Sequence, residues 1–61
     1  MKTLKEIAND LDEVAGKMKQ CAEEMEQHSG EIEYISLHAT ELNGAARQVR
    51  GWAKELRKVK A

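Results

Sequence analysis

The chain has 61 residues, of which 41% are hydrophobic and 34% are charged, and its formal net charge is −1. A chain of this length forms one small domain, residues 1–61, that buries too little apolar surface to offset its conformational entropy comfortably. Its single cysteine excludes an internal disulfide, and no cluster of Cys, His and carboxylates has metal-ligand spacing. We therefore expect no cofactor and no metal, and self-association or a partner protein becomes the expected source of additional stability.

The sequence carries no pattern that is typical of an enzyme or of a membrane protein. No Gly-rich loop follows a predicted strand, and the carboxylates fall on solvated helix faces, so no catalytic function is expected. The N-terminal stretch MKTLKEIAND is charged from the start. No apolar run approaches the ~20 residues that a bilayer-spanning helix needs. We therefore expect no membrane span and a cytoplasmic location, where a lone thiol stays reduced.

An apolar repeat with a period of 3.5 residues predicts helix along most of the chain. With Leu4 at heptad position a, every a and d position through Leu56 is apolar except His28. Thr3 followed three residues later by Glu6 is a capping-box pattern, which marks the start of the first helix. We expect helices over residues 3–28 and 31–59. The larger apolar residues of the repeat form the predicted oligomer core: Leu4, Ile7, Leu11, Val14, Met18, Cys21, Met25, Ile32, Ile35, Leu42, Val49 and Leu56.

The stretch MEQHSGEIEY, residues 25–34, decides between a hairpin and one long helix. Ser29 and Gly30 are typical turn residues, and Ser29 suits the N-cap of a second helix. A third apolar stripe lies at position e before this stretch and at position g after it, which two different helices explain better than one uniform rod. The apolar repeat continues through this stretch without a shift in its heptad positions, which favours one long helix. We predict an all-α antiparallel hairpin that folds about Gly30 and Glu31, with a single long coiled-coil helix as the alternative.

Alanines recur at every seventh position in both predicted helices. In a hairpin folded about Gly30 and Glu31, residues whose numbers sum to 61 lie opposite each other, and this register pairs alanine with alanine three times. Small residues at a helix contact allow the two backbones to approach closely. The predicted close-packed seam consists of Ala8, Ala15, Ala22, Ala39, Ala46 and Ala53.

A hairpin of two such helices leaves much of its apolar stripe uncovered, which leads to a functional hypothesis. Two copies that join their apolar stripes form a homodimeric antiparallel four-helix bundle. Burial against another protein is the alternative route. We therefore expect a non-catalytic protein–protein interaction module, such as a small regulator, inhibitor or assembly adaptor, that acts as a helical oligomer.

Charge is distributed unevenly along the chain. Residues 1–46 contain four Lys and ten Asp or Glu, a net charge of −6, whereas residues 47–61 contain six Lys or Arg and one Glu, a net charge of +5. The basic residues recur at spacings of three and four, so they form a stripe on the last helix with Trp52 beside it. This candidate surface for a nucleic acid or an acidic partner consists of Arg47, Arg50, Trp52, Lys54, Arg57 and Lys58.

Three interpretations of this basic stripe follow from the sequence, the third being contact with an acidic protein or a membrane surface. The first is RNA or DNA binding, in which the cations neutralise phosphates and Trp52 stacks on an unpaired base. The second is ion pairing within the hairpin, which contributes at most about 1 kcal/mol for each exposed pair. In the predicted register the expected pairs are Arg47 with Glu13, Arg50 with Asp10 and Asp12, and Lys54 with Glu6.

Overall fold

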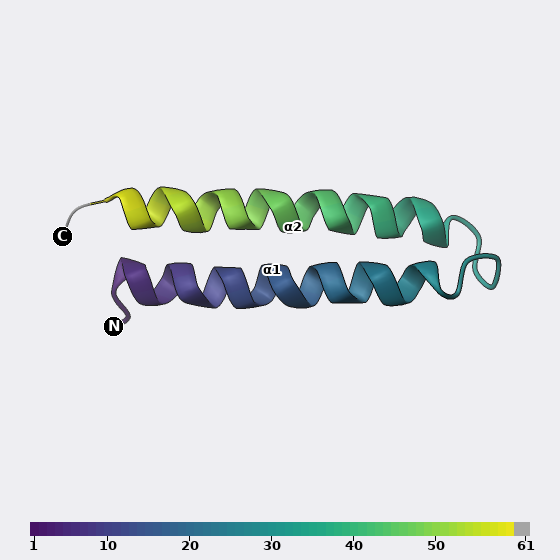
Figure 1. Ribbon diagram of the computed structural model, residues 1–61, viewed down its shortest axis with the longest axis horizontal. Coiled ribbons are helices and arrows are strands. Elements are labelled where there is room, and N and C mark those ends of the chain that lie inside the picture. Colours follow the sequence, from purple (N-terminus) through teal and green to yellow (C-terminus); the bar gives the residue numbers. More distant parts are fainter. Residues whose placement is uncertain (60–61) are drawn as a thin grey trace.

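The computed structural model describes residues 1–59, which form two antiparallel helices joined by a short connection (Figure 1). Helix α1 spans Leu4–Glu26 and helix α2 spans Ile35–Lys58. The helices lie side by side over their whole length, and the hairpin measures 48 × 15 × 14 Å. The predicted hairpin is confirmed, and the alternative of one long helix is wrong.

The capping box at the start of α1 is present as the sequence predicts. The backbone N–H of Glu6 donates to the hydroxyl oxygen of Thr3 at 3.1 Å. In return, the backbone N–H of Thr3 donates to a carboxylate oxygen of Glu6 at 3.0 Å. The bond from the Thr3 backbone lowers the pKa of Glu6 below its usual range, because it stabilises the charged carboxylate. Thr3 is therefore the cap, and Leu4 is the first helical residue.

The two helix ends at the turn differ from the approximate predicted bounds by two and four residues. The first helix ends at Glu26 and not at residue 28, and the second begins at Ile35 and not at residue 31. The last turn of α1 contains no basic residue. Its glutamates therefore meet the negative end of the helix macrodipole without compensation, which disfavours a longer helix.

The connection over residues 27–34 is a series of tight turns. Its backbone N–H groups donate three residues back, for example from Ser29 to the Glu26 carbonyl at 3.2 Å. Gly30 has φ +96° and Tyr34 has φ +65°, and such left-handed residues interrupt a right-handed helix. The predicted N-cap at Ser29 is wrong, because Tyr34 occupies that position and makes no side-chain cap.

The contact between the two helices is built almost entirely from alanine. Within residues 1–59, the buried hydrophobic residues are six alanines and Ile35, and no larger side chain is fully buried. Because alanine extends no further than its methyl group, the helix axes approach to the lower end of the usual range, about 8 Å. The buried alanines are Ala8, Ala15, Ala22, Ala39, Ala46 and Ala53.

Close packing at this alanine contact predicts a low tolerance for larger side chains. Ala15→Leu inserts three carbon atoms between the helices, and we expect it to lower the free energy of unfolding by about 1–3 kcal/mol. Gln20→Leu is the control, because Gln20 is exposed on the same helix and substitution there is expected to change stability by less than about 0.5 kcal/mol. Urea denaturation followed by circular dichroism, at one fixed protein concentration, measures both. Equal effects of the two variants would contradict close packing.

Two glycines are expected to respond to alanine with opposite signs. Gly44 lies within α2, and an added Cβ there meets no atom within 4 Å. Gly44→Ala should therefore raise the free energy of unfolding by up to about 1 kcal/mol through helix propensity. Gly30→Ala should lower it by about 1–2 kcal/mol because of its positive φ. Thermal denaturation compares the two variants, and a shift in the same direction for both would rule out the turn geometry.

Candidate functional site

The alanine contact divides the surface of the hairpin into two opposite sides. On one side, a groove near the turn is lined by the apolar residues Cys21, Met25, Ile32 and Ile35, with Glu24, His28 and Glu31 also in its lining. On the other side, a smaller groove is lined by Glu23 and Glu26 of α1 together with Thr40, Asn43 and Arg47 of α2. One side is therefore apolar and the other polar.

Helix geometry explains why each side keeps its character over the whole length. The buried alanines occupy position e of α1 and position a of α2, and residues at every seventh position share a face. Positions a and d of α1 then fall on the same side as positions d and g of α2. Leu4 and Leu56 line one hollow at the far end of this side.

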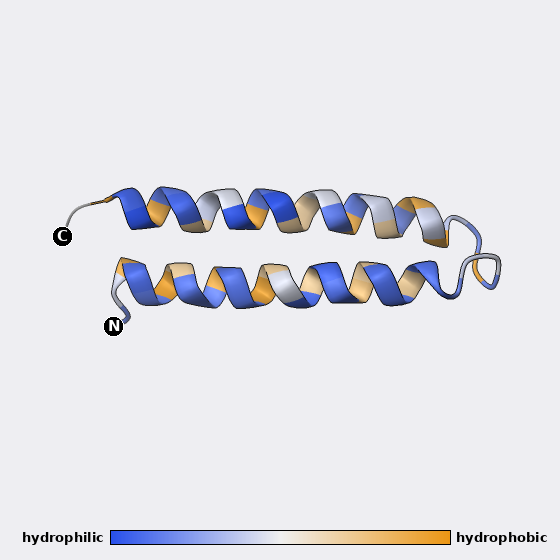
Figure 2. Cartoon of the chain, in the orientation of Figure 1, coloured by the Kyte–Doolittle hydropathy of each residue, from blue (hydrophilic) through white to orange (hydrophobic). Residues whose placement is uncertain are grey.

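The apolar side carries most of the predicted oligomer core, and we call it the apolar face. Apart from Ile35, which is buried, its larger side chains are half-buried or exposed in the hairpin, and the exposed fractions of Val14 and Trp52 are 49% and 48%. Hydrophobic bands recur along both helices (Figure 2). The apolar face consists of Leu4, Ile7, Leu11, Val14, Met18, Cys21 and Met25 of α1, Ile32 of the connection, and Ile35, Leu42, Ala45, Val49, Trp52, Leu56 and Val59 of α2.

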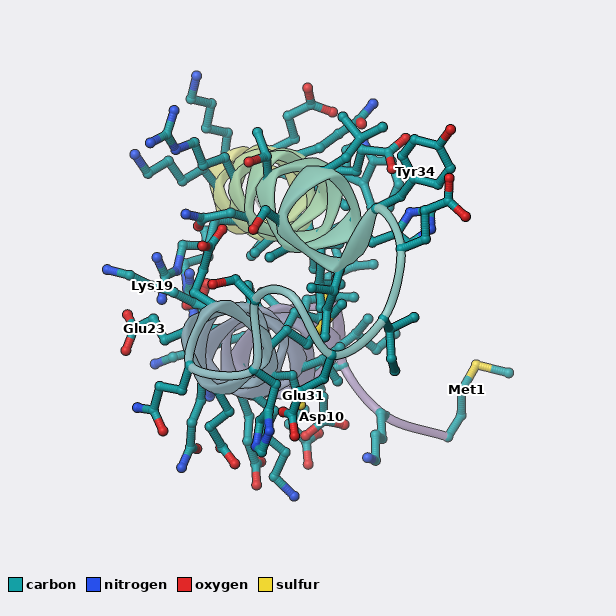
Figure 3. The ribbon with its side chains drawn as sticks, turned by 90° about the vertical axis from the view of Figure 1, so that its right-hand side faces the viewer. Met1, Asp10, Lys19, Glu23, Glu31 and Tyr34 are labelled. Carbon is teal, nitrogen blue, oxygen red and sulfur yellow. The ribbon has the colours of Figure 1, made fainter. Side chains whose placement is uncertain are left out.

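The view along the hairpin from the turn shows the same division (Figure 3). Lys19 and Glu23 project from one side, whereas Tyr34 lies on the other, and carbon-rich side chains gather between the helices away from Lys19 and Glu23. A hairpin that concentrates its uncovered apolar side chains on one face presents a surface suited to binding another apolar face.

The structure places the basic residues of α2 on the polar side. Arg57 donates to a carboxylate oxygen of Asp12 at 2.6 Å and to the side-chain oxygen of Asn9 at 2.8 Å. We call the five residues on this side the basic surface: Arg47, Arg50, Lys54, Arg57 and Lys58.

The ion pairs predicted from the register are wrong. Among residues 1–59, Arg57 is the one member of the basic surface in an ion pair with α1, and its partner is Asp12. Glu6 and Glu13 occupy position c of α1, which points away from α2. Asp10 occupies position g and is engaged by Lys2, a contact that raises the pKa of Lys2. Register decides which residues lie at the same level, but the heptad position decides whether they face each other.

Trp52 does not belong to the basic surface. It occupies position g, roughly 100° or more around the helix axis from every basic residue of the stripe, and it lies on the apolar side. The sequence contained the signal for this assignment. The alanines fall at position e in the first helix and at position a in the second, so the helix contact is not centred on the a/d stripe.

Cys21 and His28 show no arrangement that activates them. Cys21 is a free, exposed thiol on the apolar face, and His28 contacts the carboxylate of Glu31 at the exposed turn. In the part of the chain that the structure describes, no group of three or more His, Cys, Asp or Glu side chains is placed to hold a metal ion. His38 and Glu41 form a similar exposed pair at 3.0 Å.

Comparison with family models, with curated proteins and with solved structures finds no match to this chain. Neither described helix has an apolar stretch sufficient to cross a bilayer. Functional inference therefore depends on the two sides of the hairpin themselves.

The revised ion pairing makes a prediction that a double-mutant cycle measures. We expect Asp12→Ala and Arg57→Ala to show a coupling free energy of about 0.5 kcal/mol at low salt, as is usual for a partly exposed pair. Asp12→Ala combined with Arg50→Ala should show a coupling near zero. Coupling to Arg50 as large as to Arg57 would contradict the arrangement, and the Arg57 coupling should fall in ~1 M salt.

Proposed function

We propose that this protein is a non-catalytic protein–protein interaction module that acts as a helical oligomer. Its apolar face pairs with the same face of a second copy, which gives a homodimeric four-helix bundle. In that assembly the protein serves as a small regulator, inhibitor or assembly adaptor that presents its outer helix surfaces to a protein partner. The observation that carries this proposal is the concentration of uncovered large apolar side chains on one side of the hairpin.

The stability of the chain supports self-association. Alanines dominate the buried contact between the helices, and burial of an alanine methyl contributes far less than burial of a Leu or Ile side chain. Each larger side chain of the apolar face that loses its exposure in a dimer adds up to about 1.5–3 kcal/mol. A second copy therefore supplies the burial that the hairpin lacks.

The area and shape of the apolar face also suit a second copy. A face of 48 by 15 Å offers roughly 700 Å² on each copy, so two copies bury on the order of 1,400 Å², which lies within the range of stable interfaces. The face is straight and as long as the hairpin, and an identical face matches it in length. A two-fold axis makes such a contact self-complementary and closed.

The one tryptophan of the chain reports on this dimer without any substitution. Trp52 lies exposed on the apolar face of the single hairpin, and dimerisation is expected to remove it from water. Its fluorescence emission should therefore shift to longer wavelength when the protein is diluted below the dissociation constant. Sedimentation equilibrium over the same concentrations should show the mass falling from two chains to one. If the Trp52 emission wavelength stays constant and the mass equals that of one chain at every concentration, the proposed dimer is overturned.

A matched pair of variants tests whether the apolar face forms the contact. Val14→Asp places a charge in the centre of this face, and we expect it to weaken dimerisation at least tenfold because a buried unpaired carboxylate is costly. Gln20→Asp introduces the same charge at an exposed position outside the face and should leave the dimer unchanged. Circular dichroism establishes whether each variant remains helical, and a helical Val14→Asp dimer would refute the assignment.

A further inference from the structure

We infer that the basic surface, together with Lys5 of α1, binds the phosphate backbone of a nucleic-acid duplex without reading its bases. This interaction is additional to the proposed dimer. The basic surface and the apolar face lie on opposite sides of the hairpin, so either contact can form without the other.

Most cations of the basic surface are available to a ligand. Arg57 is engaged by Asp12 and Asn9. The other four cations make no ion pair with another residue in the described range 1–59, and three of them are exposed while Arg50 is half-buried. Lys5 occupies the same heptad position of α1 as Asp12, the partner of Arg57, so it lies on the polar side and extends the surface across the helix contact. The free cations of α2 are Arg47, Arg50, Lys54 and Lys58.

Few carboxylates oppose these cations on their own side. In the open half of the hairpin, within residues 1–59, Asp12 is the acidic residue whose heptad position faces the basic surface, and Arg57 neutralises it. Glu55 lies three residues before Lys58 in α2 and therefore borders the basic surface at that end. The carboxylates of Glu23 and Glu26 lie on the same side near the turn. A polyanion therefore finds attraction at the open end and repulsion near the turn.

The dimensions of the basic surface suit a duplex. From Arg47 to Lys58 the helix rises about 17 Å, and the five cations fall within an arc of roughly 100° around its axis. This length matches the rise of about five base pairs, in which each strand carries one phosphate per ~3.4 Å. Because α2 is a continuous helix over this span, its cations form a band that runs along the helix axis.

The position of the aromatic residues decides between nucleic-acid forms. Binding of single strands relies on stacking between bases and aromatic side chains. The chain contains one Trp, one Tyr and no Phe. Trp52 lies on the apolar face, and Tyr34 lies at the turn on the side opposite Lys19 (Figure 3). No aromatic side chain accompanies the basic surface in the described residues, so the expected contacts go to the phosphates, which carry no sequence information.

The same arrangement disfavours an anionic membrane as the partner. An interfacial helix inserts its apolar face while flanking basic residues meet the headgroups. Here the cations of α2 face away from its apolar residues, and α1 covers part of the helix between them. A rigid polyanion binds through charge alone, so it matches the basic surface better than a membrane does.

The expected binding is weak and strongly dependent on salt. Four free cations that each neutralise one phosphate give a slope of log K against log salt of about −4. Dissociation constants for such nonspecific contacts lie at about 10⁻⁴–10⁻⁶ M. The carboxylates elsewhere on the chain, with a net charge of −1 overall, keep the affinity at the weak end of this range.

Fluorescence anisotropy of a labelled 20-base-pair DNA duplex in ~50 mM salt tests the inference with the full chain. Lys54→Glu should weaken binding at least tenfold and reduce the salt slope. Lys17→Glu is the matched control, since it makes the same charge change at an exposed residue of α1 whose heptad position, g, faces away from the basic surface, and its effect should be less than about threefold. Asp12→Asn removes the opposing carboxylate and releases Arg57, so it should tighten binding of the duplex. If the Asp12–Arg57 pair were only structural, its loss would not tighten binding.

Each remaining outcome decides against the inference in a different way. No binding of the duplex in ~50 mM salt, or equal losses for Lys54→Glu and Lys17→Glu, would exclude a local phosphate-binding surface. Tighter binding of a single strand than of the duplex would indicate that the surface contacts bases and not the phosphate backbone. Binding to vesicles that contain anionic lipid, without binding to the duplex, would assign the surface to a membrane. Trp52 emission should be unchanged in Lys54→Glu, so failure here is separate from failure of the dimer.

Discussion

The contact between six alanines at the centre of the hairpin is the constraint from which the rest of this structure follows. Small side chains bring the two helices close together and leave no space between them for a large residue. The larger apolar side chains must therefore lie beside the contact and not within it. A hairpin with Leu or Ile at the same positions would bury them between wider-spaced helices and would expose less apolar surface.

Because the larger apolar side chains lie beside the alanine contact, the hairpin has two different sides. Because the helices are antiparallel, the apolar positions of both fall on one side and the basic positions of α2 fall on the other. The proposed dimer uses the first side and the inferred duplex contact uses the second. Two copies joined through their apolar faces would display their basic surfaces on opposite outer sides of the bundle, where neither blocks the other.

Much of the fold was predictable from particular residues. The a/d repeat predicted helices, Thr3 and Glu6 predicted the start of α1, and Ser29 with Gly30 predicted a turn. The helix ends at the turn were not predictable with the same accuracy. The conformation of residues 27–34 depends on left-handed residues at Gly30 and Tyr34, and a Tyr rarely adopts that conformation by its own preference. Glu6, Asp10 and Glu13 were wrong as expected partners of the basic surface because chain register does not give helix orientation, and these carboxylates point away from α2.

The sequence by itself determined the helical repeat, the capping box and the alanine spacing, because each depends on residues a few positions apart on one helix. Only the tertiary structure decided that Arg57 pairs with Asp12 and that the apolar stripes of both helices share one side. The physical reason is that a heptad position gives a direction around one helix axis, whereas a contact depends on how two axes are placed and rotated relative to each other. That placement is set by the packing of the alanines, which brings residues distant in the sequence to the same level and the same side.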